Sequence, residues 1–161
     1  MISTAKATQT LAFEFGATSF TPASNYYIGL TTTAITIDEN GKGVGFTEPT
    51  NTGYARISVA NTTANWSVVN AEVKNIPQLA FPTFTSAPSL GSGTEAVGWF
   101  ISEHENASAT GDCAIYFGTF TTIDPDTQKS VPSPKPLVAE SEIVIKAGGL
   151  SIKRANECDV A

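Results

Sequence analysis

The feature that most constrains the fold of this chain is the regular alternation of short apolar runs with turn-forming residues. Runs rich in Val, Ile, Thr and aromatic residues recur about every 8 to 15 residues, and Gly, Pro, Asn and Asp separate them. No glycine-rich turn links a strand to a helix, which excludes nucleotide-binding α/β folds. The pattern predicts an all-β, antiparallel, single-domain protein, built either as a sandwich or as a barrel-like, jelly-roll-like body.

We expect about seven or eight strands, bounded by proline, glycine and asparagine. In chain order they are residues 25–30, 54–59, 71–76, 78–82, 95–102, 113–120, 142–146 and 150–154, with an extended segment around Trp66 and a short β excursion at Ile35 and Ile37. Residues 95–102 should pair with 113–120 as a long-looped hairpin. The turn Ala147-Gly148-Gly149 separates two β-branched runs and predicts a tight hairpin at the end of the chain.

The N-terminal segment differs from the rest of the chain. Residues 4–15 have a helical pattern of apolar residues, and Gly16 is a natural stop. We therefore expect an N-terminal arm or short helix over residues 1–24, a β-sandwich domain over 25–154, and a flexible C-terminal tail over 155–161. Residues 124–136 hold four prolines and predict an extended crossing of the surface.

The charge pattern excludes one class of partner. The chain of 161 residues has a net charge of −6, and its nine Lys and Arg residues are scattered. Binding to nucleic acid needs clustered basic residues, so we expect no nucleic-acid partner. No window approaches the roughly 18 apolar residues of a membrane span, and the first 16 residues carry no apolar block of the secretory type. We therefore expect no membrane insertion and no export signal.

Charged residues make up only 15% of the chain, against a typical value of about 25%. The surface must therefore be completed by Thr, Ser and Asn, which makes it polar but weakly charged. Such a surface favours contact with other β surfaces.

The sequence gives no reason to expect a metal or cofactor. Cys113 and Cys158 have no second Cys or His at ligand spacing, and nothing supports a disulfide between them. Cys113 lies in an apolar run and reads as a small buried residue, whereas Cys158 reads as a free thiol in the tail. The acidic stretches 38–43 and 124–127 look like calcium loops but lack the full twelve-residue pattern, so turn formation explains them better.

We also expect no enzyme activity. His104 is the single histidine and lies in a polar loop, where Ser102 is its nearest candidate nucleophile. A triad needs a base that an acid orients beside the nucleophile, and close neighbours on a hairpin loop seldom have that geometry. Paired carboxylates for glycoside hydrolysis need only meet in space, but Glu48, Glu95 and Glu103 have nothing besides position in their favour.

The loop that enters the strand at residue 54 is the candidate partner-binding site. Pro49 and Gly53 fix its backbone, and in the strand Tyr54, Arg56 and Ser58 should share one face while Ala55, Ile57 and Val59 share the other. The second face can be buried while the first presents an aromatic ring and a guanidinium. The predicted contact residues are Glu48, Asn51, Gly53, Tyr54 and Arg56.

Aromatic side chains leave a second type of site open. Tyr26, Tyr27, Trp66, Trp99 and Phe100 could line a sugar-binding groove. Burial in the core is the more common fate of such residues, above all of the two tryptophans.

With these residues laid out, the chain resembles a family of small structural proteins of tailed bacteriophages that are commonly labelled phage tail fibre proteins. The resemblance rests, in order, on Phe15-Gly16, Phe20-Thr21-Pro22, Tyr27–Thr32, Thr47-Glu48-Pro49, Gly53–Ile57, the segment from Asn75-Ile76 to Phe81-Pro82, Val97–Phe100, and Gly148-Gly149-Leu150. The order and spacing of these motifs hold over most of the chain. The Pro-rich segment 124–136 and the charged tail depart from the usual member.

The resemblance implies a non-enzymatic virion component that is assembled in the host cytoplasm. It would bind other phage structural proteins in many copies, through the loops around Glu48 to Gly53 and through its termini. It would be located either on the capsid, as a decoration or cement subunit, or on the tail. It would form homo-oligomers, of which a trimer is one possibility. The alternative is a carbohydrate-binding module that contacts glycans on the host surface.

Overall fold

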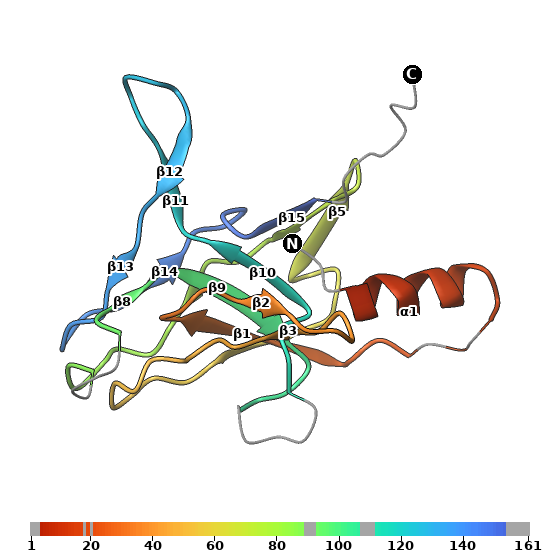
Figure 1. The fold of residues 1–161 in the computed structure, drawn as a ribbon, viewed down its shortest axis with the longest axis horizontal. Coiled ribbons are helices and arrows are strands. Elements are labelled where there is room, and N and C mark those ends of the chain that lie inside the picture. The colour runs from red at the N-terminus through yellow and green to blue at the C-terminus, as the bar shows by residue number, and fades with distance from the viewer. Residues whose placement is uncertain (1–3, 18, 20, 89–92, 107–111, 154–161) are drawn as a thin grey trace.

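The computed structural model describes residues 4–17, 19, 21–88, 93–106 and 112–153, and its regular secondary structure is mostly β strand (Figure 1). The N-terminal helix α1 spans Thr4–Glu14. It ends in a Schellman motif: Gly16 has φ 68°, its amide donates to the carbonyl of Phe13 (3.1 Å), and the amide of Ala17 donates to that of Ala12 (2.8 Å). The predicted helix with its glycine stop is thus confirmed. No helix among the described residues is long and apolar enough to cross a membrane.

The central sheet has four antiparallel strands in the order β10 (Tyr116–Thr119), β9 (Gly98–Ser102), β1 (Asn25–Thr31) and β4 (Ile57–Ala60). The pairing of β9 with β10 confirms the predicted long-looped hairpin. The strand predicted at residue 54 begins three residues later, at Ile57, because the preceding residues form a turn and an ion-pair cluster that are described below.

A second sheet has three antiparallel strands in the order β15 (Ser151–Lys153), β6 (Glu72–Asn75) and β5 (Trp66–Val69). Four short pairs complete the fold: β7 (Leu79–Ala80) with β14 (Val144–Ile145), β8 (Glu95–Ala96) with β13 (Lys135–Pro136), β2 (Thr36–Ile37) with β3 (Gly43–Val44), and β11 (Thr121–Ile123) with β12 (Ser130–Pro132). The all-β antiparallel prediction is therefore confirmed. Of its two forms the barrel is absent in the described part of the chain, where β4 and β10 are the open edges of the central sheet.

The main core packs against one face of the central sheet. Ile28 and Leu30 of β1 are fully buried there, together with Phe81 and Phe84 from the segment after β7. Residues close to the end of the chain complete the same cluster: Leu137, Ile143, Ile145 and Leu150. The hydrophobic effect thus binds the first and last strands into one body.

A smaller core covers the opposite face of the same sheet. Phe100 of β9 is fully buried and packs with Phe46 from the loop after β3, their ring centroids being 4.4 Å apart. Gly29 of β1 makes room for this ring, because a Cβ atom at that position would overlap Phe100. A glycine inside a strand thus marks the point where a neighbouring ring lies against the backbone.

The predicted terminal hairpin is wrong. β14 pairs with β7 and β15 pairs with β6, so the strands on either side of Gly148-Gly149 belong to different sheets. The cause is Asn75, which is buried and occupies the turn: its Nδ2 donates to the carbonyl of Lys146 (2.9 Å), and its Oδ1 accepts from the amide of Leu150 (2.8 Å). A side chain distant in sequence therefore takes the place of the hairpin's own ladder.

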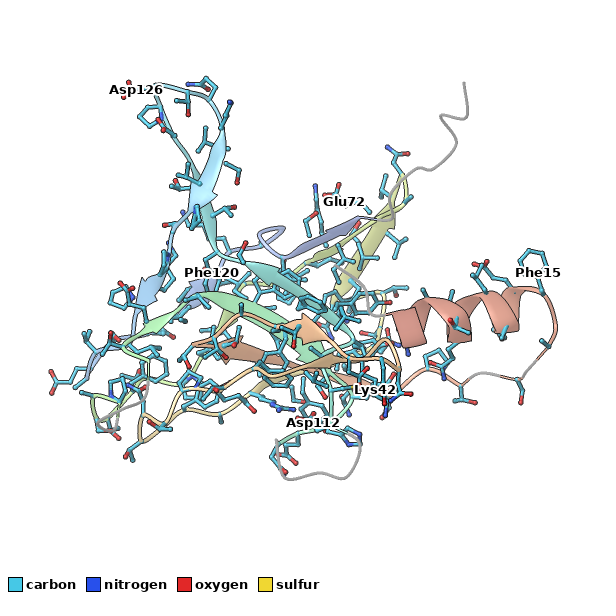
Figure 2. The ribbon with its side chains drawn as sticks, in the orientation of Figure 1. Phe15, Lys42, Glu72, Asp112, Phe120 and Asp126 are labelled. Carbon is cyan, nitrogen blue, oxygen red and sulfur yellow. The ribbon has the colours of Figure 1, made fainter. Side chains whose placement is uncertain are left out.

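The predicted crossing at residues 124–136 is also wrong in part. β11 and β12 form a hairpin that projects from the body, with Asp126 at its tip (Figure 2). Only afterwards does the chain return along β8 through β13. Pro125 lies in the turn at the tip, Pro132 lies at the base of the hairpin, and Pro134 and Pro136 lie in the return segment, where pairing is short. The tail 155–161 and Cys158 lie outside the described residues.

Candidate functional site

The loop before β4 is a tight turn that is bonded to a neighbouring segment. The amide of Tyr54 donates to the carbonyl of Asn51 (3.1 Å), and Gly53 has φ 93°. A Cβ at Gly53 would lie 2.7 Å from the carbonyl oxygen of Thr83, so only glycine fits. The amide nitrogen of the Asn51 side chain donates to the carbonyl of Ser86 (2.9 Å). These bonds hold the loop against the segment after β7.

Arg56 is the centre of a buried ion-pair cluster. Its Nη2 lies 2.6 Å from Glu48 Oε1 and 2.7 Å from Asp112 Oδ2, and its Nη1 donates to Asp112 Oδ1 (2.9 Å) and to the carbonyl of His104 (2.7 Å). Its Nε donates to both oxygens of Glu48 (3.2 and 3.1 Å). All five guanidinium N–H groups therefore have acceptors. The guanidinium carbon also lies 4.8 Å from the centroid of the Phe100 ring, which adds a cation–π contact.

Two hydroxyl groups complete this Arg56 cluster. The hydroxyl of Tyr54 donates to Glu48 Oε2 (2.7 Å) and accepts from the amide of Leu30 (3.0 Å), while that of Ser102 donates to Asp112 Oδ1 (2.6 Å). Burial raises the pKa of Asp112, but hydrogen bonds from Arg56 and Ser102 and the charge of Arg56 outweigh it, so the pKa lies below its usual value. Burial and the charge of Glu48 raise the pKa of Tyr54, which keeps its proton.

The expectation that this face presents Arg56 to a partner is wrong. Arg56 is only 8% exposed and Asn51 only 4%, and the Arg56 guanidinium and the side-chain nitrogen of Asn51 donate to groups inside the protein. Glu48 and Tyr54 do line an open depression of about 430 Å³, with Arg56 at its floor. Four neighbouring residues complete its lining: Pro49, Ala55, Glu105 and Asn106. Gly53 is exposed. Contact between this loop and a virion protein stays a prediction.

Sequence reasoning missed Asp112, which lies 56 residues from Arg56. In the sequence Ser102 is the nearest candidate nucleophile to His104, but in the structure Ser102 is fully buried and supports the Arg56 cluster. The amide of His104 donates to Ser102 Oγ (3.0 Å) and its carbonyl accepts from Arg56, so its backbone holds the cluster. The one available signal was that an arginine in a half-buried strand of a chain with few charges needs carboxylate partners.

The two stretches that resembled calcium loops are turns. Asp38 Oδ1 accepts from the amides of Asn40 (3.0 Å) and Lys42 (2.7 Å), and Asp124 Oδ1 accepts from the amide of Asp126 (2.8 Å). These bonds are typical of Asx turns, as expected. Within the described residues no group of three or more His, Cys, Asp or Glu side chains converges as a metal site would. Cys113 is a half-buried free thiol whose pKa burial raises.

An aromatic pocket of about 210 Å³ lies where the two sheets meet. Tyr26 of β1 and Tyr116 of β10 line it from the central sheet, and Trp66 of β5 lines it from the second sheet. Tyr26 and Trp66 meet edge to face, with centroids 6.5 Å apart and planes at 81°. Asn61 stands at the rim, and four aliphatic side chains complete the wall: Val68, Val73, Ile101 and Ile152. Two of the aromatic residues singled out in the sequence thus come together.

One polar atom of the Trp66 side chain is unsatisfied. The indole N–H of Trp66 is buried, and no acceptor for it exists among the described residues. Phe100 lies in the smaller core, and Trp99 packs on the main core away from this pocket. The expectation of core burial therefore fits Phe100 fully and the two half-buried tryptophans in part.

The largest exposed apolar side chains of the N-terminal segment lie on α1 and directly after it. Leu11, Phe13 and Phe15 are 44%, 52% and 82% exposed. Leu11 and Phe15 lie four residues apart, hence on the same side of the helix axis. The helix extends away from the sheets with Phe15 at its far end (Figure 2), and Lys6 ties its near end to Glu103 (2.7 Å).

Comparison with known proteins gives one family. A family model described as podophage GP4 fiber I protein gp80 matches residues 1–122. The matched part contains α1, the Arg56 cluster, Tyr26, Trp66 and Tyr116, and it ends inside β11. No curated protein matches the chain.

Proposed function

The chain belongs to the family of the podophage GP4 fiber I protein gp80, and from this premise we propose that it attaches to other virion proteins in many copies, without enzyme activity. Membership makes it a phage structural protein of the fibre type. The sequence leaves two locations on the virion open, and of these the family favours the tail fibre over capsid decoration. Many weak contacts repeated by symmetry would give durable attachment.

The observation that carries the proposal is the exposed apolar side of α1. An isolated helix of fewer than about 12 to 15 residues is marginal in water, and the 11-residue α1 exposes Leu11 and is followed directly by the exposed Phe15. Apolar residues at i and i+4 are the anchors by which an amphipathic helix enters a hydrophobic groove. We infer that a groove on a neighbouring virion protein covers this side, in agreement with the expectation that the termini make contacts.

Incorporation into particles tests this attachment. Leu11→Ser and Phe15→Ser together remove the anchors, and Ile123→Ser on β11 is the matched control because Ile123 is also exposed, at 59%, but lies far from α1 in the chain. We expect mass spectrometry of washed particles to find wild type and the control variant but not the double variant, although circular dichroism shows all three folded. Equal incorporation of the double variant would refute the role of α1, and absence of wild type would refute the proposal.

The second candidate function is a carbohydrate-binding module that contacts the host surface. The aromatic pocket favours it, because Tyr26, Trp66 and Tyr116 meet at one concave site. Binding of the purified chain to envelope polysaccharide of the host, in a pull-down with washed cell walls, tests this function. A chain that hydrolysed the polysaccharide over a range of pH would contradict the proposed lack of enzyme activity.

A further inference from the structure

We propose that the outer edge of β14 pairs with β14 of a second copy of the chain, antiparallel about a two-fold axis at Val144, so that two subunits share one continuous sheet. This inference rests on the proposed function, in which the chain is present in many copies. It names the surface by which two of these copies contact each other.

β14 is an open edge of the fold, because among the described strands it pairs only with β7. The amide of Phe81 donates to the carbonyl of Ile143 (2.9 Å), so these two residues are a hydrogen-bonded pair of the antiparallel ladder. The next pair, Val144 with Ala80, is then a non-hydrogen-bonded pair. The N–H and C=O of Val144 therefore point away from β7, and neither has a hydrogen-bond partner within the described part of the chain. Such an edge is a template for another strand.

An apolar groove of about 470 Å³ lies beside this edge and is lined by residues of both β13 and β14. Its lining includes Phe120, Val138 and Val144, of which the two valines are 52% and 39% exposed. β13 is protected against strand pairing, because Pro136 stands at an outward-facing position and has no N–H. A second subunit paired with β14 would remove apolar surface of the groove from water.

The charges beside Val144 select a second copy as the partner of this edge. Glu142 and Lys146 lie two residues before and two residues after Val144, both are exposed, and neither forms an ion pair with another described residue. In antiparallel pairing about Val144, Glu142 of each copy stands opposite Lys146 of the other, which is favourable. Parallel pairing in register would place like charges opposite each other, which is unfavourable. The segment is thus complementary to itself in one direction only.

The backbone groups fit the same register. The two copies of Val144 can exchange a pair of N–H···O bonds, and the amide of Lys146 can donate to the carbonyl of Glu142 in the other copy. The carbonyl of Lys146 is not needed, since it already accepts from the amide of Gly149 (2.8 Å) and from Asn75 Nδ2 (2.9 Å), which occupy both of its lone pairs. The contact uses the same surface on both subunits, so it closes at two copies and does not involve α1.

Sedimentation velocity of the full chain and of two charge-reversed variants tests this register. Glu142→Lys and Lys146→Glu each place like charges opposite each other in both cross-strand pairs, so each variant alone should dimerise about tenfold more weakly than wild type. An equimolar mixture of the two variants should regain the wild-type affinity, because every Lys then stands opposite a Glu in the mixed dimer. Glu39→Lys is the matched control: it makes the same change of charge at an exposed residue between β2 and β3 and should dimerise like wild type.

Hydrogen exchange at the amide of Val144 reports on the edge itself. This amide should exchange slowly in the wild-type dimer, and quickly when wild type is diluted below its dissociation constant or when either variant is measured alone. The dilution series needs no variant, so it decides the question even if a charge-reversed chain does not fold.

Four outcomes overturn the inference: a wild-type chain that stays monomeric up to about 100 μM, single variants that associate as well as wild type, a mixture that associates no better than its components, or exchange at Val144 that does not depend on concentration. These failures differ from those of the proposed function. A monomeric wild type that is still found in washed particles would keep the attachment and remove only this contact between copies. A dimer of this register whose chain is absent from the particles would refute the attachment and keep the contact.

Discussion

Replacement of Arg56 by methionine is the sharpest test of the Arg56 cluster. Methionine keeps the apolar stem over Phe100 but leaves Glu48 and Asp112 without their cation. The side chains of Arg56 and Asp112 are only 1% and 7% exposed, so the loss belongs to the class of broken buried ion pairs, about 3–5 kcal/mol. Domains of this size have a free energy of unfolding of about 5–15 kcal/mol, so the variant should lose a large part of it.

Urea unfolding followed by tryptophan fluorescence measures this loss. With a denaturant slope of about 2 kcal/mol per molar, a cost of about 4 kcal/mol lowers the midpoint by about 2 M. Lys74→Met is the matched control, because Lys74 pairs with Glu72 at 3.1 Å but its side chain is 45% exposed, which predicts a change below about 1 kcal/mol.

A double-mutant cycle decides whether the effect comes from the ion pair itself. If Arg56 acts through Asp112, the double variant Arg56→Met, Asp112→Asn should cost at least about 1 kcal/mol less than the sum of the single variants. A cost for Arg56→Met no larger than that of Lys74→Met, or strict additivity in the cycle, would show that the cluster does not stabilise the fold in the way its geometry indicates.

The other predictions concern pH, packing, the Asn75 turn and the free thiol. The pKa of Asp112 is lowered on folding, so the stability that its carboxylate contributes is fully present above the ordinary carboxyl pKa of 3.8 and is lost as the pH falls through the lower folded pKa. Below about pH 4 the free energy of unfolding should therefore depend less on pH in Asp112→Asn than in wild type. An equal dependence on pH in the two proteins would argue against this role of Asp112. Gly29→Ala should lower the melting temperature by an amount that reflects about 1–3 kcal/mol, since its Cβ overlaps Phe100, and an unchanged melt would mean that the ring moves freely. Asn75→Ala should speed hydrogen exchange at the Leu150 amide, whereas unaltered exchange would show that water replaces the lost acceptor. Cys113 should react slowly with maleimide at neutral pH because burial raises its pKa, and rapid labelling of Cys113 would contradict this.

The parts of the fold that could be predicted are those with local causes. The helix α1 and its Gly16 stop follow from apolar spacing and the left-handed conformation at that glycine. The β9–β10 pair follows from two apolar runs joined by one polar loop. The path of the chain after Gly148-Gly149, which leads into another sheet, has no such local cause. The hydrogen bonds that decide it come from Asn75, more than 70 residues earlier.

The candidate site could be predicted only in part, because some of its contacts join residues far apart in the sequence. The sequence places Tyr54 and Arg56 on one side of an extended segment, but it cannot show that Asp112 lies on the other side of them. Without that carboxylate an arginine is expected to remain in water, and with it the guanidinium is buried. Tyr26 and Trp66 were both singled out, yet Tyr116 and the contact between two sheets that turns them into a pocket come from long-range pairing.

The projecting β11–β12 hairpin offers a place to label the subunit. Its ends are held together, since Thr121 lies opposite Pro132 and the amide of Ser133 donates to the carbonyl of Phe120 (2.8 Å). Extra residues inserted between Asp126 and Thr127 would lengthen only a closed, solvent-facing tip, at an entropic cost that grows slowly with length. A short epitope grafted there would carry an antibody fragment outward from the body, and its density in electron micrographs would mark where each copy sits on the particle.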